Sequence, residues 1–128
     1  MARINIPRTD RTPDVLFDTD SGIIEMKGCS IHENADGFFM PLLDMMEEYI
    51  RKPAPTTRVV LNLSYFNSSS SKYILDLLKL LDEVHAAGLG TVTMEWHHDQ
   101  DDLDMAEAGQ DYKALLDMPV TLVSDITR

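Results

Sequence analysis

Cysteine, positive charge and long hydrophobic runs are all scarce in this chain of 128 residues. The single cysteine, Cys29, excludes an internal disulfide framework and is typical of a reducing compartment. The 11 basic residues stand against 22 acidic ones, and a net charge of −11 argues against binding to nucleic acid or anionic membrane surfaces. No apolar run approaches the roughly 18 residues that a membrane-spanning helix needs, and residues 1–7 lack the apolar core of a signal peptide. We therefore expect a cytoplasmic protein that does not insert into membranes.

The rest of the composition is that of an ordinary globular protein, with 44% hydrophobic and 26% charged residues. A domain usually has roughly 100–200 residues, so we expect residues 1–128 to form a single domain. At this length a core needs neither a metal nor a disulfide to hold it together. The polar residues 1–12, which contain Pro7 and precede Pro13, are predicted to form an extended arm.

Five segments have the pattern of β-strands. Residues 14–18 and 23–28 are separated by Asp and Gly residues that favour a turn, which predicts an opening hairpin. Residues 58–66 are apolar and β-branched, as in a strand from the middle of a sheet. Residues 91–97 alternate between apolar and polar side chains, and residues 120–123 form a last short strand.

Three segments have helical spacing. Asn34 is a candidate cap for a helix that runs to residue 51, and residues 72–85 form a second helix that Gly88 and Gly90 end. The third helix follows the acidic patch at residues 99–104. Its apolar positions are Met105, Ala108, Tyr112, Leu115 and Leu116. The predicted order is β-β-α-β-α-β-α-β, which indicates an α/β fold with a mainly parallel sheet and right-handed crossovers.

A metal site is the first chemical hypothesis. The available ligands are His32, His85, His97, His98 and the carboxylates of residues 99–104. No pair of histidines has the spacing of a zinc motif, and the acidic patch lacks the alternation and the central Gly of a calcium loop. We therefore expect no metal and no cofactor, and we interpret the aspartates as residues that favour the start of a helix.

A nucleophilic enzyme is the second hypothesis. The serine run at residues 68–71 has no G-x-S-x-G surroundings, and Cys29 has no activating base beside it in the sequence. A base from elsewhere in the fold would leave this hypothesis open. A third hypothesis, a sensor of a small molecule, needs a ligand cavity. The motifs that cradle phosphates in nucleotide-binding proteins are absent. We expect no catalytic residues.

The junction Phe66-Asn67-Ser68-Ser69-Ser70-Ser71-Lys72 is more informative. Asn and Ser are preferred helix caps, but one cap needs only one such residue. In a mainly parallel sheet, ligands and partners meet the carboxyl ends of the strands, where this junction lies. A phosphate on a serine here would face free N–H groups and the positive end of a helix dipole. The junction is therefore a candidate phosphorylation site.

The same junction resembles the regulatory loop of the SiaC-type bacterial phosphoproteins. The resemblance covers nearly the whole chain. Its further blocks are Thr12-Pro13 before Phe17-Asp18, the segment Gly28-Cys29-Ser30-Ile31-His32-Glu33-Asn34, and Trp96-His97-His98-Asp99 through Asp111-Tyr112. It implies a fold similar to STAS domains. It also implies a signalling role in which the unphosphorylated protein binds a diguanylate cyclase and stimulates synthesis of cyclic di-GMP, favouring biofilm formation.

In such proteins a dedicated Ser/Thr kinase adds the phosphate and a PP2C-type phosphatase removes it. The residue that matches the phosphoacceptor is Ser68, where the family usually has Thr in a Phe-Asn-Thr-Ser-Ser context. We expect the partner to contact the residues around it, namely Asn67, Ser69, Ser70, Lys72, Tyr73, Leu75 and Asp76. Leu75 and Leu80 fall off the core stripe of their helix, so they are either docking surface or partly buried under neighbouring loops.

Overall fold

The computed structural model describes residues 3–125 and has an α/β fold of six strands and three helices. The elements are β1 (Arg3–Ile6), β2 (Asp14–Asp18), β3 (Ile23–Ser30), α1 (Ala35–Tyr49), β4 (Thr56–Phe66), α2 (Ser68–Ala87), β5 (Thr91–Asp99), α3 (Leu103–Leu115) and β6 (Val120–Asp125). No helix among these residues is long and apolar enough to cross a membrane.

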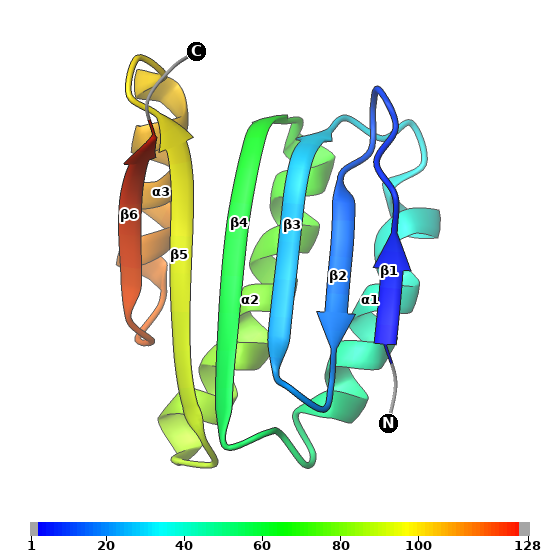
Figure 1. Cartoon of the computed structure of the whole chain (residues 1–128), viewed down its shortest axis with the longest axis vertical. Helices are drawn as coiled ribbons and strands as arrows, with labels where there is room; N and C mark the ends of the chain where they lie inside the picture. Colours follow the sequence, from blue (N-terminus) through cyan, green and yellow to red (C-terminus); the bar gives the residue numbers. More distant parts are fainter. Residues whose placement is uncertain (1–2, 126–128) are drawn as a thin grey trace.

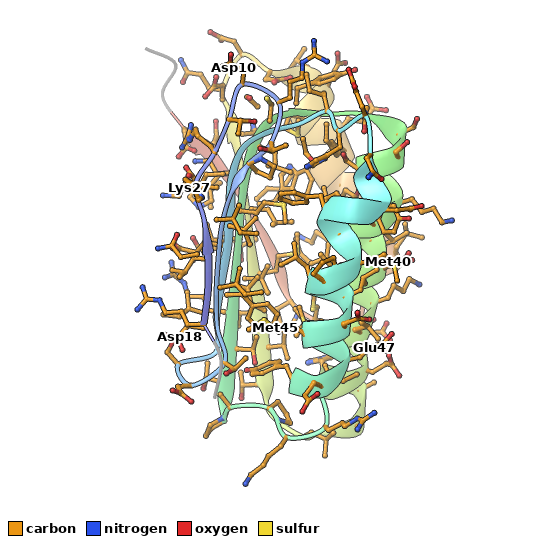
Figure 2. All side chains as sticks on the ribbon, turned by 90° about the vertical axis from the view of Figure 1, so that its right-hand side faces the viewer. Asp10, Asp18, Lys27, Met40, Met45 and Glu47 are labelled. Carbon is orange, nitrogen blue, oxygen red and sulfur yellow. The ribbon has the colours of Figure 1, made fainter. Side chains whose placement is uncertain are left out.

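The strands lie in the sheet in the order of the sequence, from β1 to β6. β1, β2 and β3 are antiparallel neighbours, whereas β3, β4, β5 and β6 run parallel to one another. Because each parallel connection crosses over with the same hand, all three helices cover one face of the sheet (Figure 1). The opposite face is open, and Lys27 projects from it while Met40 and Glu47 lie on the side of α1 away from the sheet (Figure 2).

The hydrophobic core lies between the sheet and the helices. Alternate residues of the neighbouring strands β4 and β5 point into it, and those of β5 are Val92, Met94 and Trp96. Helix α2 contributes the predicted stripe, which consists of Ile74, Leu77, Leu78, Leu81 and Val84. The predicted α/β class, the opening hairpin, the mainly parallel sheet and the order of elements from residue 14 onward are confirmed.

Three predictions differ from the structure. Residues 3–6 of the predicted arm form the edge strand β1, in which Ile4 and Ile6 pair with Phe17 and Val15, so the order begins with three strands instead of two. Helix α2 begins at Ser68 instead of residue 72 because Asn67 caps it there. Of the predicted apolar positions of α3, Leu115 is 53% exposed because the helix ends at this residue, whereas Leu116 is buried.

Gly109 gives a test of the packing of α3. A methyl group at Gly109 would lie 2.5 Å from Cδ1 of Trp96, whose indole N–H donates to the Met105 carbonyl oxygen. Overpacking costs about 1–3 kcal/mol, whereas Ala in place of Gly favours a helix interior by about 1 kcal/mol. We expect Gly109→Ala to lower the free energy of unfolding by about 1 kcal/mol in urea denaturation. The exposed neighbour Gln110, replaced by Ala, is the control. A Gly109→Ala protein as stable as the control would contradict this packing.

Candidate functional site: the start of helix α2

The junction between β4 and α2 is held in place by Asn67. Its backbone is extended, and its side-chain oxygen accepts a hydrogen bond of 3.0 Å from the backbone N–H of Ser70, which satisfies one of the free donors of the helix start. The backbone N–H of Asn67 donates to the carbonyl oxygen of Ser30 at 3.0 Å, and its side-chain N–H donates to that of His32 at 3.4 Å. The capping residue is therefore anchored to the end of β3 and to the residues that follow it.

The four serines of the junction differ in exposure. Ser68 and Ser69, the first two residues of α2, are exposed to solvent. Ser70 is fully buried, with a relative exposure of 0%. Ser71 is half-buried, and its hydroxyl lies 2.9 Å from the Tyr112 oxygen, while the Tyr112 hydroxyl donates to the Ser71 carbonyl oxygen. Burial raises the pKa of Tyr112, so this phenol stays protonated as a donor. A modifying enzyme therefore has direct access only to the hydroxyls of Ser68 and Ser69 within this run.

Beneath the exposed serines lies a buried polar cluster of Ser30, His32 and Ser70. The Ser30 hydroxyl donates to Oγ of Ser70 at 2.8 Å. Nδ1 of His32 lies 3.1 Å from Oγ of Ser30 and 3.3 Å from Oγ of Ser70. Burial lowers the pKa of His32 because desolvation disfavours its charged form. The cluster therefore joins the end of β3 to the first turn of α2 through neutral hydrogen bonds.

The remaining predicted contact residues lie on the first turns of α2 with different exposures. Lys72 and Asp76 are exposed. The Tyr73 ring is half-buried and stacks on Phe39 of α1, with ring centroids 5.3 Å apart. Leu75 and Leu80 are both half-buried and pack against the core. The outward surface of this end of α2 is thus formed by Ser68, Ser69, Lys72 and Asp76, whereas Ser70 supports it from below.

The other candidate ligands and nucleophiles lie in separate places. His97 contacts Glu95 at 3.0 Å and Asp125 at 3.1 Å, and Glu95 also pairs with Arg58 on the open face of the sheet. Asp102 of the acidic patch caps α3, as its predicted role at a helix start requires. Within residues 3–125, no group of three or more His, Cys, Asp or Glu side chains is arranged to hold a metal ion.

Cys29 follows Gly28, where the pairing of β3 with β4 shifts its register. Its thiol donates to the Asp10 carbonyl oxygen at 2.9 Å. No imidazole or carboxylate forms a hydrogen bond with this sulfur in the described part of the chain. A hollow of about 550 Å³ opens beside the start of α1, and His32, Asn34 and Phe38 are among its lining residues.

The sequence did not predict the buried cluster. His32 was considered as a possible metal ligand and within the segment 28–34 that resembles the family, and Ser30 only within that segment. Two signals were present. Ser70 precedes Ile74, Leu77, Leu78 and Leu81 at helical spacing, which places it on the buried stripe. Ser30 closes the buried alternation of β3 after Ile24 and Met26. Neither signal indicates that the two residues meet, because they are far apart in the sequence.

A family model for SiaC family regulatory phosphoproteins matches residues 6–125 of the chain. The chain belongs to the SiaC family. An uncharacterized protein of Pseudomonas aeruginosa strain UCBPP-PA14 is 30% identical over 122 residues, which are 95% of this chain and 96% of that protein. The crystal structure of apo-SiaC from P. aeruginosa superimposes with a TM-score of 0.88 at 30% identity, covering 97% of this chain and 100% of that one.

A second SiaC structure has a partner. The crystal structure of the diguanylate cyclase SiaD in complex with its activator SiaC from P. aeruginosa contains a chain that matches with a TM-score of 0.89 at 30% identity. The match covers 95% of this chain and 99% of that chain. The predicted membership of a family of regulatory phosphoproteins is therefore confirmed, and a SiaC relative of the same fold activates a cyclase.

Proposed function

We propose that this SiaC family protein is a phospho-switch adaptor. In its unphosphorylated form it binds a diguanylate cyclase and raises the synthesis of cyclic di-GMP. A Ser/Thr kinase phosphorylates Ser68 and thereby blocks binding, and a PP2C-type phosphatase restores it. The observation that carries the proposal is the exposed hydroxyl of Ser68 at the first position of α2, in a chain whose relative SiaC is a cyclase activator.

The helix start tolerates a phosphate on Ser68. The first N–H groups of a helix have no partner within the helix, and the dipole favours negative charge at this end. The Asn67 side chain already accepts from Ser70 N–H, and the N–H groups of the two exposed serines have no hydrogen-bond partner among the described residues. Phosphorylation is therefore expected to leave the fold intact and to act on docking.

The switch has to be local. A phosphate adds about −1.5 to −2 charges, a small change for a chain that already carries −11. At the surface of Ser68, Ser69, Lys72 and Asp76, however, a docked partner would have to desolvate the dianion. Leaving such a charge poorly paired costs several kcal/mol, and each 1.4 kcal/mol is tenfold in affinity. A loss of about 2–4 kcal/mol, roughly 30- to 1000-fold in affinity, is enough for an on/off switch.

Site mapping tests the modification step. After incubation with the cognate kinase and ATP, we expect intact mass spectrometry to show one added phosphate and peptide mapping to place it on Ser68. Ser68→Ala should abolish the incorporation of phosphate. Of the other hydroxyls of the run, Ser69 lies at a different position of the helix, Ser71 is half-buried and Ser70 is buried. Ser69→Ala, which removes the other exposed hydroxyl, is the matched control and should still accept the phosphate. Full incorporation into the Ser68→Ala protein would remove Ser68 from the mechanism.

A further inference from the structure

His32 occupies an unusual position between two helix starts. It lies just before α1, and its ring contacts Ser70 in the first turn of α2. Both helices begin at the same end of the sheet (Figure 1). The side chain has a relative exposure of only 9%, and Phe38 and Phe39 cover it with ring centroids 4.2 Å and 5.2 Å away. Its Nε2 atom is buried without a hydrogen-bond partner among the described residues.

No described carboxylate forms a hydrogen bond or an ion pair with this imidazole. The titratable or charged residues on the surrounding segments include Cys29 on β3, Arg11 and Glu33 on the loops, Asp36 on α1, and Lys72 and Tyr73 on α2. Arg11 and Glu33 pair with each other at 3.2 Å in solvent, and Asp36 and Lys72 are exposed. Cys29 donates to a backbone carbonyl oxygen, and Tyr73 stacks on Phe39. A histidinium at this place would therefore have no compensating charge in contact with it.

Two effects oppose the uptake of a proton by His32. A buried cation without a counter-charge loses its hydration, and the positive ends of α1 and α2 both repel it. With its proton on Nε2, the neutral ring accepts at Nδ1 from the Ser70 hydroxyl, which itself accepts from Ser30. The charged ring is a donor at both nitrogens and loses this bond. The buried Nε2 of the charged ring gains hydration when the ring turns toward the hollow beside the start of α1, and this movement separates His32 from Ser30 and Ser70.

We propose that His32 is a positioning residue whose neutral ring holds the first turn of α2, and that proton uptake by His32 releases the turn that carries Ser68. The effect of this release on docking rests on the proposed function. If the cyclase binds only the ordered turn, its affinity falls by up to about tenfold for each pH unit below the pKa of His32. Stability changes in the same direction. Below the ordinary His pKa of about 6.5, the unfolded chain gains a proton that the folded chain resists, so stability falls as the pH falls.

The test uses nuclear magnetic resonance on the full chain between pH 7.5 and 5. We expect the ring signals of His32 and the backbone amide signals of Ser69 and Ser70 to change with a common midpoint. In His32→Asn, whose amide places a polar atom near the position of Nδ1 but does not titrate, the serine signals should stay constant over this range. The control is His85→Asn, which removes a histidine from the last turn of the same helix. It should behave like the native protein.

Two results would overturn the inference. One is that the Ser69 and Ser70 signals do not follow the titration of His32 in the native protein, a measurement that does not depend on the folding of any variant. The other is an unchanged pH response in His32→Asn. Cyclase binding is measured at the same pH values, and His32→Asn should lose the native pH dependence that His85→Asn keeps. If the cyclase binds at no pH while the serine signals follow His32, the proposed function fails and the positioning role stands.

Discussion

Replacing Ser68 with Asp is expected to weaken binding of the purified cognate diguanylate cyclase by at least about 30-fold, equivalent to about 2 kcal/mol. The carboxylate adds one permanent charge where the native hydroxyl is exposed at the first position of α2. A docked partner would have to desolvate that charge without a cation to pair with it. A phosphate imposes the same kind of penalty, and its charge is larger. Ser68→Ala keeps the surface neutral and should bind like the native chain. Calorimetry or interferometry measures all three affinities.

The fold itself should not suffer from this substitution. Asp near a helix start is favoured by the dipole, so Ser68→Asp should unfold at the same urea concentration as the native protein or at a higher one. A loss of binding then reports on docking and not on stability. Cyclase activity, followed as cyclic di-GMP produced per unit time, should fall in parallel with the affinity.

Ser21 provides a matched control for the added charge. It is an exposed serine in the turn between β2 and β3, at the opposite end of the sheet from the start of α2 (Figure 1). Ser21→Asp takes the net charge to the same value as Ser68→Asp but leaves the α2 surface unchanged. It should bind like the native chain. Equal weakening by the two substitutions would mean that overall repulsion acts and that Ser68 has no local role.

The parts of the fold that local pattern determines could be predicted from the sequence. The apolar β4 and the stripe of α2 each follow from the spacing of apolar residues, and Asn67 and Asp102 cap helices as their residue types favour. The edge strand β1 was missed because it is short and pairs, among the described strands, with β2 alone. Its own residues therefore give little sign of the pairing that stabilises it.

One part of the candidate site could likewise be predicted from the sequence, and another part could not. The position and exposure of Ser68 follow from a polar junction between a strand and a helix. The contact of Ser70 with Ser30 and His32 depends instead on the parallel pairing of β3 with β4, which brings the ends of the two strands together. Since this pairing links distant parts of the chain, no local pattern indicates it, and the role of His32 emerges only from the folded structure.

Phe39→Ala is expected to lower the free energy of unfolding by about 3–5 kcal/mol, the usual cost of removing a buried aromatic side chain and leaving a cavity. Phe39 has an exposure of 0%, stacks on Tyr73 and lies 5.2 Å from the His32 ring between centroids. It therefore links α1 to the first turns of α2 by packing alone. The neighbouring Met40 is 46% exposed, and Met40→Ala should change stability by no more than about 0.5 kcal/mol.

The same substitution distinguishes general destabilisation from a local effect on the site. Because the stack on Tyr73 supports the first turns of α2, amide hydrogen exchange at Ser70 and Ser71 should rise more in Phe39→Ala than exchange in β5, which Phe39 does not contact through any ring pair. Equal acceleration in both places would show that the loss is global and that Phe39 does not specifically order the helix start. Protection retained at Ser70 would assign the ordering of this turn to Asn67 and the buried serine–histidine cluster alone.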